Sequence, residues 1–133
     1  MINRTVHYLV ENRKLLYALF FIITAATLFL TLVPSDRLGN NSLFKYDKFG
    51  HFMMFFCWTM AFGLLSFSKK GPGNTKVIAI FFIGSLFGIS IEIFQHYMPF
   101  GRTADLYDAI ADISGSLTAA IILHILKKNY LSD

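Results

Sequence analysis

Ionisable and amide side chains gather in one stretch, residues 92–115, that begins and ends within apolar sequence. Charged side chains cost about 2.5–3.5 kcal/mol each on membrane-insertion scales, and at membrane depth they mark functional sites by default. A second polar group stands at the start of an upstream apolar run. The two groups together supply Asp47, Lys48, His51, Glu92, Gln95, His96, Arg102, Asp105, Asp108 and Asp112.

The charge balance of these groups points to a site that needs compensation. Five of the chain's eight acidic residues lie in them, against Lys48 and Arg102 as the cations. In a medium of low dielectric constant several carboxylates cannot all stay ionised unaided. Shared protons, a bound metal ion or a cationic group of a ligand could compensate for the excess.

Two kinds of chemistry suit these residue types. His51 with Glu92 and Asp112 has the donors of a zinc or manganese site, and an all-oxygen set suits magnesium or calcium. A divalent metal is therefore a candidate cofactor. No His-Glu-x-x-His motif is present, so no cofactor is certain. Apolar surroundings favour the neutral form of Glu92, which with His51 as partner suits general acid–base catalysis. The guanidinium of Arg102 matches the geometry of a phosphate.

Composition indicates lipid as the surroundings of this chain. Of its 133 residues 55% are hydrophobic and 15% charged, and fifteen are phenylalanine. The net charge of +4 would fit a nucleic-acid partner, but the basic residues stand in short segments between apolar runs. We therefore expect no nucleic-acid partner. Cys57 is the only cysteine, which excludes an intrachain disulfide.

Four apolar runs predict an all-α integral membrane protein, a bundle of four transmembrane helices over residues 15–33, 49–68, 77–98 and 109–126. Together they form one membrane domain, residues 15–126, followed by a cytoplasmic tail, residues 127–133. The first run is too long for the apolar part of a typical signal peptide. Residues 1–14 fit a short interfacial helix or a basic cytoplasmic tail. Gly84 and Gly88 form a small-residue pair suited to close helix packing.

The distribution of lysine and arginine predicts the orientation. Eight lie in residues 1–14, 69–76 and 127–128, and four in the loops 34–48 and 99–107. Cytoplasmic loops carry the excess of basic residues, so both termini are predicted to be cytoplasmic. Every unusual polar residue then falls at the outer ends of the last three spans.

Helical spacing predicts which of these side chains meet. Asp47 and His51 are four residues apart and share a helical face. Asp105, Asp108, Asp112 and Gly115 step by 3, 4 and 3, which is one stripe of a helix that begins near Asp105. We expect His51, Glu92 and Asp112 to converge, and Gly115 to allow a neighbouring helix to approach closely.

Purely structural interpretations of the same residues stay open. Asp47 and Lys48 could form a solvated pair, and Arg102 with Asp105 and Asp108 could tie the outer loop to the bundle. Glu92 and Gln95 could serve an interhelical hydrogen bond. His96 fits an interfacial histidine better than a member of the site.

In this order and spacing the motifs resemble those of VanZ-like proteins: Asp47-Lys48-x-x-His51, Glu92-x-x-Gln95, and Arg102 followed by Asp108-x-x-x-Asp112-x-x-Gly115. The resemblance covers residues 45–126. It implies a small helical bundle in a bacterial plasma membrane, and the family's namesake is associated with low-level resistance to the glycopeptide teicoplanin. The family commonly has asparagine where this chain has Asp112, which makes the cluster more acidic here.

Three functions follow as hypotheses. The first is binding or protection of an envelope lipid or a lipid-linked cell-wall precursor, with Lys48 and Arg102 on phosphate and the carboxylates on an amine or metal. The second is a hydrolase or transferase acting on such a lipid, with Glu92 and His51 as acid–base pair and Asp108 and Asp112, with His51, holding a metal. The third is a small oligomeric transporter or channel, disfavoured because the inner half lacks polar pathway residues.

Overall fold

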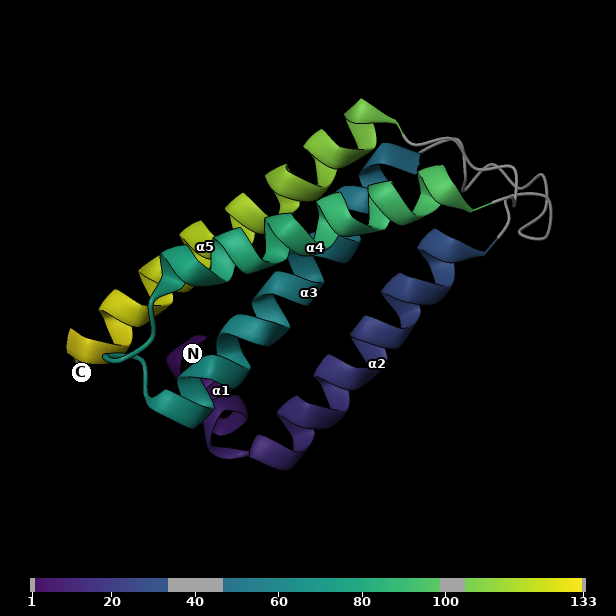
Figure 1. Ribbon diagram of the computed structural model, residues 1–133. Helices are drawn as coiled ribbons and strands as arrows, with labels where there is room; N and C mark the ends of the chain where they lie inside the picture. Colours follow the sequence, from purple (N-terminus) through teal and green to yellow (C-terminus); the bar gives the residue numbers. More distant parts are fainter. Residues whose placement is uncertain (1, 34–46, 99–104, 133) are drawn as a thin grey trace.

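The chain is described here from a computed structural model that covers residues 2–33, 47–98 and 105–132, with side chains for residues 4–33, 48–98 and 105–130. Within these residues it consists of helices joined by short segments (Figure 1). The helices are α1 (Ile2–Glu11), α2 (Arg13–Leu32), α3 (Asp47–Lys70), α4 (Val77–Tyr97) and α5 (Leu106–Ser132).

The four long helices, α2 to α5, are each long and apolar enough to cross a membrane, as the sequence predicted. Their bounds differ from the apolar runs mainly in α5, which begins at Leu106 and continues to Ser132. Lysine is a good helix former, so Lys127 and Lys128 do not end the helix. The Nζ of Lys127 donates hydrogen bonds to the carbonyl oxygens of Gly73 and Thr75, 3.2 and 2.8 Å away, which fixes this end of α5 to the α3–α4 turn.

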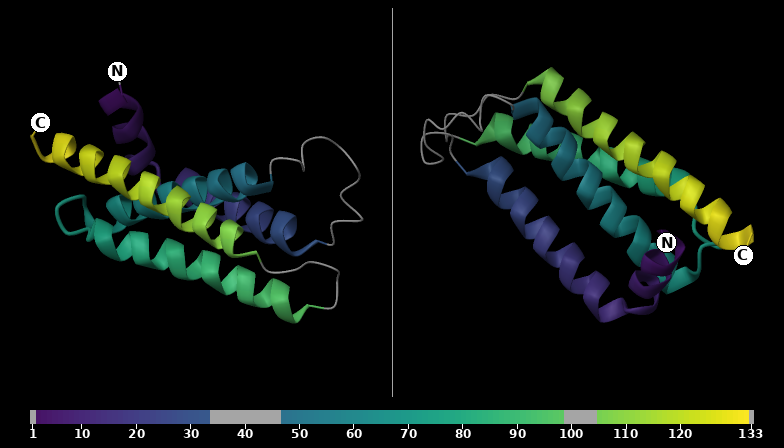
Figure 2. Two further views of the ribbon diagram at one scale, coloured as in Figure 1. Left: turned by 90° about the horizontal axis from the view of Figure 1, so that it is seen from above. Right: turned by 180° about the vertical axis from the view of Figure 1, so that it is seen from behind.

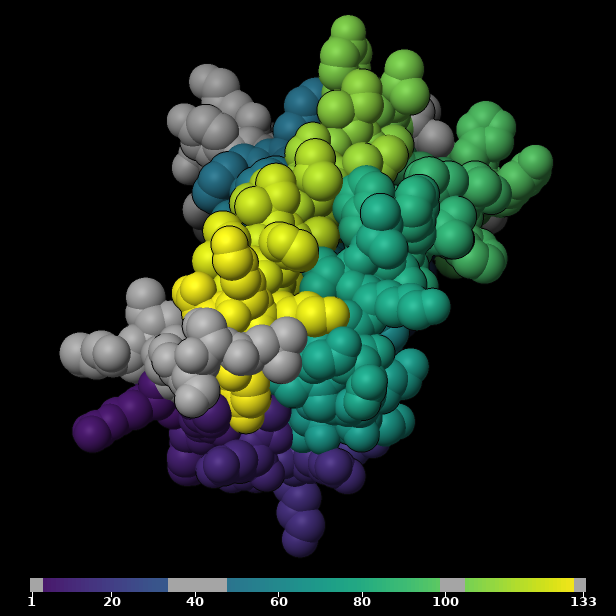
Figure 3. Space-filling view, turned by 90° about the vertical axis from the view of Figure 1, so that its left-hand side faces the viewer, coloured from purple at the N-terminus to yellow at the C-terminus, as the bar shows by residue number. Residues whose placement is uncertain are grey.

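The segment before α2 is helical over Ile2–Glu11, and its position at the membrane interface stays a prediction. Val10 of α1 packs in a core cluster with Phe67, Ile80 and Leu123. The ring of His7 stacks on a tyrosine of α5 with 4.2 Å between ring centroids. Figure 3 shows α1 against the end of α5, with α4 and α5 lying side by side on this face. A helix with one apolar face can bury it against the bundle even where the segment is short.

The arrangement of the helices divides the bundle into two ends (Figures 1 and 2). One end holds both termini and the α3–α4 turn. The other holds the end of α2, the start of α3, the end of α4 and the start of α5. In the described part of the chain, the first end carries eight lysines and arginines and the second carries Lys48 alone. The two termini thus lie on the same side of the bundle, and which side of the membrane this is stays a prediction.

Helix α2 packs least closely against the rest. Its buried residues are Leu16, Thr27 and Thr31. The indole Nε1 of Trp58 in α3 donates a 3.0 Å hydrogen bond to the hydroxyl of Thr24. Between helices in lipid there is no hydrophobic driving force, so polar contacts such as this one contribute to holding α2 in place.

Candidate functional site

A buried cluster of ionisable side chains lies at the end of the bundle away from the termini. It combines His51 of α3, Glu92 of α4, and Asp108 and Asp112 of α5. His51 and Asp112 are 1% and 0% exposed, so they are shielded from both water and lipid. The predicted convergence of His51, Glu92 and Asp112 is present in the structure.

The imidazole of His51 is the centre of the cluster. Its Nδ1 lies 2.9 Å from Oδ1 of Asp112, a hydrogen bond in which the ring nitrogen donates when the carboxylate is ionised. The same Nδ1 is 3.7 Å from Oε1 of Glu92, and Nε2 is 4.0 Å from Oδ2 of Asp108. One ring therefore stands among three carboxylates, and a proton on the ring would offset one of their negative charges.

Asp105 and Lys48 stabilise the start of α5. Asp105 precedes the helix and accepts a 2.9 Å hydrogen bond from the backbone amide of Tyr107, as a capping residue does. The Nζ of Lys48 donates to Asp105 at 2.9 Å and to Asp108 at 3.2 Å. The hydrogen bond from Lys48 lowers the pKa of the Asp105 carboxyl, and that from the Tyr107 amide adds to the effect. The amide of Asp105 donates to Oε2 of Glu92 at 3.3 Å, which joins this corner to the buried cluster.

Glycines set how closely the three helices approach at the site. A methyl group at Gly115 would overlap the backbone carbonyl oxygen of Phe52, which confirms that α3 approaches α5 at this residue. A methyl group at Gly88 would lie 2.7 Å from Cβ of Asp112, too close for an ordinary contact. Gly84 faces the hydroxyl groups of Thr59 and Ser116 in the same way. The backbones, and not only the side chains, therefore fix the distances between His51, Glu92 and Asp112.

The donor set of this cluster fits a divalent metal ion. One ligand atom each from His51, Glu92 and Asp112 can be chosen so that all lie within 4.8 Å of one another. Nitrogen and carboxylate oxygen donors are those of zinc and related ions. Oε1 of Glu92 is buried and has no hydrogen-bond partner among the described residues. An unsatisfied buried carboxylate oxygen is costly, so a proton, a cation or a ligand at this point would stabilise it.

The remaining predicted site residues are placed as follows. Asp108 lies beside the three converging groups with its Oδ2 toward His51, while its Oδ1 accepts a hydrogen bond from Lys48. Gln95 is buried, and its Nε2 donates to the carbonyl oxygen of Thr31 in α2 at 2.6 Å. His96 is exposed. The described residues include the backbone of Asp47 but not its side chain, and Arg102 lies outside them. The ligand-binding roles of these residues stay predictions.

A groove between α4 and α5 leads to the cluster from the side of the bundle. It has a volume of about 370 Å³ and is lined by Ile89, Glu92, Ile93, His96, Tyr97 and Ala109. Ile93 and Tyr97 are 53% and 80% exposed, so the groove is open on the side that would face lipid. Its apolar lining escaped the sequence analysis because such isoleucines look the same as any lipid-facing residue.

The family model of VanZ/LLP1 matches residues 7–127. The chain belongs to the VanZ/LLP1 family. No curated protein and no solved structure matches it. The matched range includes the four long helices up to the end of the apolar part of α5, and with them the whole buried cluster. The resemblance found in the motifs of the sequence is therefore confirmed at the level of the family.

Proposed function

We propose that this protein binds an envelope lipid or a lipid-linked cell-wall precursor in the α4–α5 groove, with the lipid's polar group at the buried cluster. One observation carries the proposal: Glu92 belongs to both places. Its carboxyl group is part of the cluster around His51, and it also lines the groove. A groove of this volume lies within the usual range of ligand pockets.

The properties of the two parts match the two parts of a lipid. Apart from Glu92 and His96, the groove is lined by isoleucine, alanine and tyrosine, which suit a hydrocarbon chain. The cluster holds an excess of carboxylates, which suits an amine, or a metal ion that in turn holds phosphate. Lys48 lies beside it with its side chain half exposed. In the proposed orientation, with the termini in the cytoplasm, the site lies at the outer face of the plasma membrane.

The test is mass spectrometry of the lipids that co-purify with the protein. Ile93→Trp would fill the groove, and the matched control Ile110→Trp alters an equally exposed isoleucine that does not line it. Displacing about two methylene groups of a lipid from the groove costs about 1.6 kcal/mol, so Ile93→Trp should retain roughly tenfold less lipid. Glu92→Gln, which keeps the shape of the side chain but removes one carboxylate from the cluster, should also retain less lipid. Equal retention by both tryptophan variants would contradict the proposal.

A lipid-linked precursor as the ligand would connect the protein with glycopeptide resistance. Cells that produce the wild-type chain should then tolerate more teicoplanin than cells that produce Ile93→Trp at the same level. Equal tolerance, with lipid binding intact in the wild type, would restrict the proposal to lipid binding alone.

A hydrolase or transferase acting on the same lipid is the second candidate, favoured by the convergence of His51, Glu92 and Asp112 within 4.8 Å. A divalent ion held there would polarise a phosphoryl or carbonyl oxygen of the headgroup. In this candidate function the protein's own residues orient the headgroup, and His51 and Glu92 hold or move a proton.

Metal analysis of purified protein separates the two candidates. The enzyme interpretation predicts about one bound divalent ion per chain in the wild type, lost in His51→Ala and Asp112→Ala. His96→Ala, which removes an exposed histidine at the same end of the bundle, should keep the ion. Lipid binding without any stoichiometric metal would favour the first function.

A further inference from the structure

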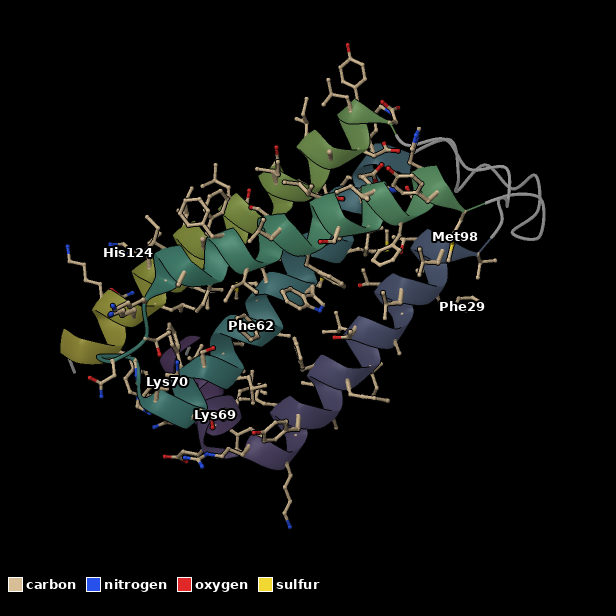
Figure 4. All side chains as sticks on the ribbon, viewed as in Figure 1. Phe29, Phe62, Lys69, Lys70, Met98 and His124 are labelled. Carbon is tan, nitrogen blue, oxygen red and sulfur yellow. The ribbon has the colours of Figure 1, made fainter. Side chains whose placement is uncertain are left out.

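A second pocket lies at the opposite end of the bundle from the buried cluster, where α3 turns into α4. Its volume is about 320 Å³. Ser66 and Lys70 of α3, Lys76 at the turn, and Ala79 and Ile83 of α4 contribute to its lining, with Phe62 deeper in α3. We refer to it as the α3–α4 lysine pocket. Figure 4 shows Lys70 at this end of the bundle and Phe62 further along α3.

The charged side chains that line this pocket are both cationic. Lys70 and Lys76 are exposed, and neither forms an ion pair with a carboxylate in the described part of the chain. No carboxylate lines the pocket. Lys76 also caps α4 without a side-chain hydrogen bond, so the positive end of the helix dipole adds to the two ammonium groups. This combination attracts an anion.

The rest of the pocket is apolar and continues toward the middle of the bundle. Phe62 is eight residues before Lys70, which corresponds to about 12 Å along α3. Ile83 is seven residues after Lys76, about 10 Å along α4. Both walls therefore extend inward from the lysines to a similar depth. The lysines mark the ends of two membrane-spanning helices, where lipid headgroups lie.

We propose that the α3–α4 lysine pocket binds one anionic phospholipid, with its phosphate at Lys70 and Lys76 and one acyl chain along Phe62, Ala79 and Ile83. Charge and depth together select this ligand. A soluble anion would leave the apolar walls uncovered, and a zwitterionic lipid would not compensate the two ammonium groups. Basic pockets between membrane helices commonly bind anionic headgroups. The proposal does not depend on the function of the carboxylate cluster.

The test is native mass spectrometry of the purified full chain in detergent with added dioleoylphosphatidylglycerol or dioleoylphosphatidylcholine. The two lipids have the same acyl chains and differ in headgroup charge. Each lysine close to an anionic headgroup strengthens binding about fivefold, so Lys70→Gln with Lys76→Gln should weaken phosphatidylglycerol binding about 25-fold. The control, Lys14→Gln with Lys128→Gln, removes the same charge from exposed lysines outside the pocket and should keep the wild-type affinity.

A second pair of variants tests the place of the acyl chain. Ala79→Trp places a large side chain in the apolar part of the pocket, and Ala18→Trp makes the same change at an exposed alanine of α2. Only the former should weaken phosphatidylglycerol binding. Because both alanines are exposed, neither change disturbs the core.

Four results would overturn the proposal. Equal loss of phosphatidylglycerol binding in the two lysine double variants would indicate general surface electrostatics, and equal binding of both lipids by the wild type would exclude selection by charge. Unchanged phosphatidylglycerol binding by Ala79→Trp would exclude the acyl-chain site. Displacement of the lipid by inorganic phosphate would assign the lysines to a soluble anion.

Discussion

Replacement of Gly115 by alanine tests how the helices hold the site. The new methyl group would overlap the carbonyl oxygen of Phe52 and lie 3.0 Å from the amide nitrogen of Phe56, whereas ordinary contacts begin near 3.4 Å. Both atoms belong to the backbone of α3, so no side chain can rotate to relieve the overlap. Helices α3 and α5 must therefore move apart by at least several tenths of an ångström.

The size of the effect follows from two opposing contributions. Overpacking costs about 1–3 kcal/mol, and a backbone obstacle places this site at the upper end. Alanine in place of glycine stabilises a helix by roughly 0.5–1 kcal/mol. We expect a net loss of about 2 kcal/mol in the free energy of unfolding. The same displacement would lengthen the 2.9 Å hydrogen bond between His51 and Asp112, one turn away from Gly115.

Equilibrium unfolding in detergent micelles, followed by the fluorescence of Trp58, the only tryptophan, measures this loss. Gly50→Ala is the matched control, because a methyl group at Gly50 would meet nothing within 4 Å. The control should be as stable as the wild type or slightly more stable. If Gly115→Ala unfolds at the same denaturant concentration as Gly50→Ala, α3 and α5 are not in backbone contact at the site.

Three further predictions concern the two ends of the bundle. Asp105→Asn should destabilise the protein at pH 7, because the lowered pKa of Asp105 stabilises the fold while the carboxyl is ionised. The effect should shrink as the pH falls below the usual aspartate pKa near 3.9 and vanish below the lowered pKa of the folded state. Unfolding measured at a series of pH values from 7 downward checks it, and an effect that does not shrink below the usual aspartate pKa would refute the role of Lys48. Gln95→Ala should cost about 1–3 kcal/mol, since the buried carbonyl group of Thr31 loses its donor, and unfolding titration checks it. A cysteine at Gly73 should react with membrane-impermeant reagents only from the cytoplasmic side, and labelling from outside would reverse the proposed orientation.

The positions of the main site residues could be predicted because the helical spacing of these residues agrees with the order of the spans. The 3, 4, 3 spacing of Asp105 to Gly115 places Asp112 and Gly115 on one face of α5, and the order of the spans brings that face to α3 and α4. Polar groups at membrane depth have few alternatives to one another as partners. His51, Glu92 and Asp112 therefore converge as their spacing implies.

The direction of Gln95 could not be predicted in the same way. Its spacing from Glu92 puts both on adjacent parts of one face of α4, but Glu92 lies toward α5 and Gln95 reaches α2. Which neighbour stands beside each part of a helix face depends on the packing of the whole bundle, which spacing does not encode. The groove between α4 and α5 could not be predicted for the same reason, since it depends on how far apart the two helices lie beyond their contact at Gly88.

The segregation of charge between the two ends of the bundle has an electrical consequence. In the described residues, eight lysines and arginines and Glu11 stand at one end, and the other end holds Lys48 with Asp47, Glu92, Asp105, Asp108 and Asp112. An energised membrane acts on such a polarised molecule, because moving one charge through 100 mV is worth about 2.3 kcal/mol. A potential that is negative inside therefore favours the orientation with the basic end in the cytoplasm. The voltage of the living cell would help to keep the protein from inverting.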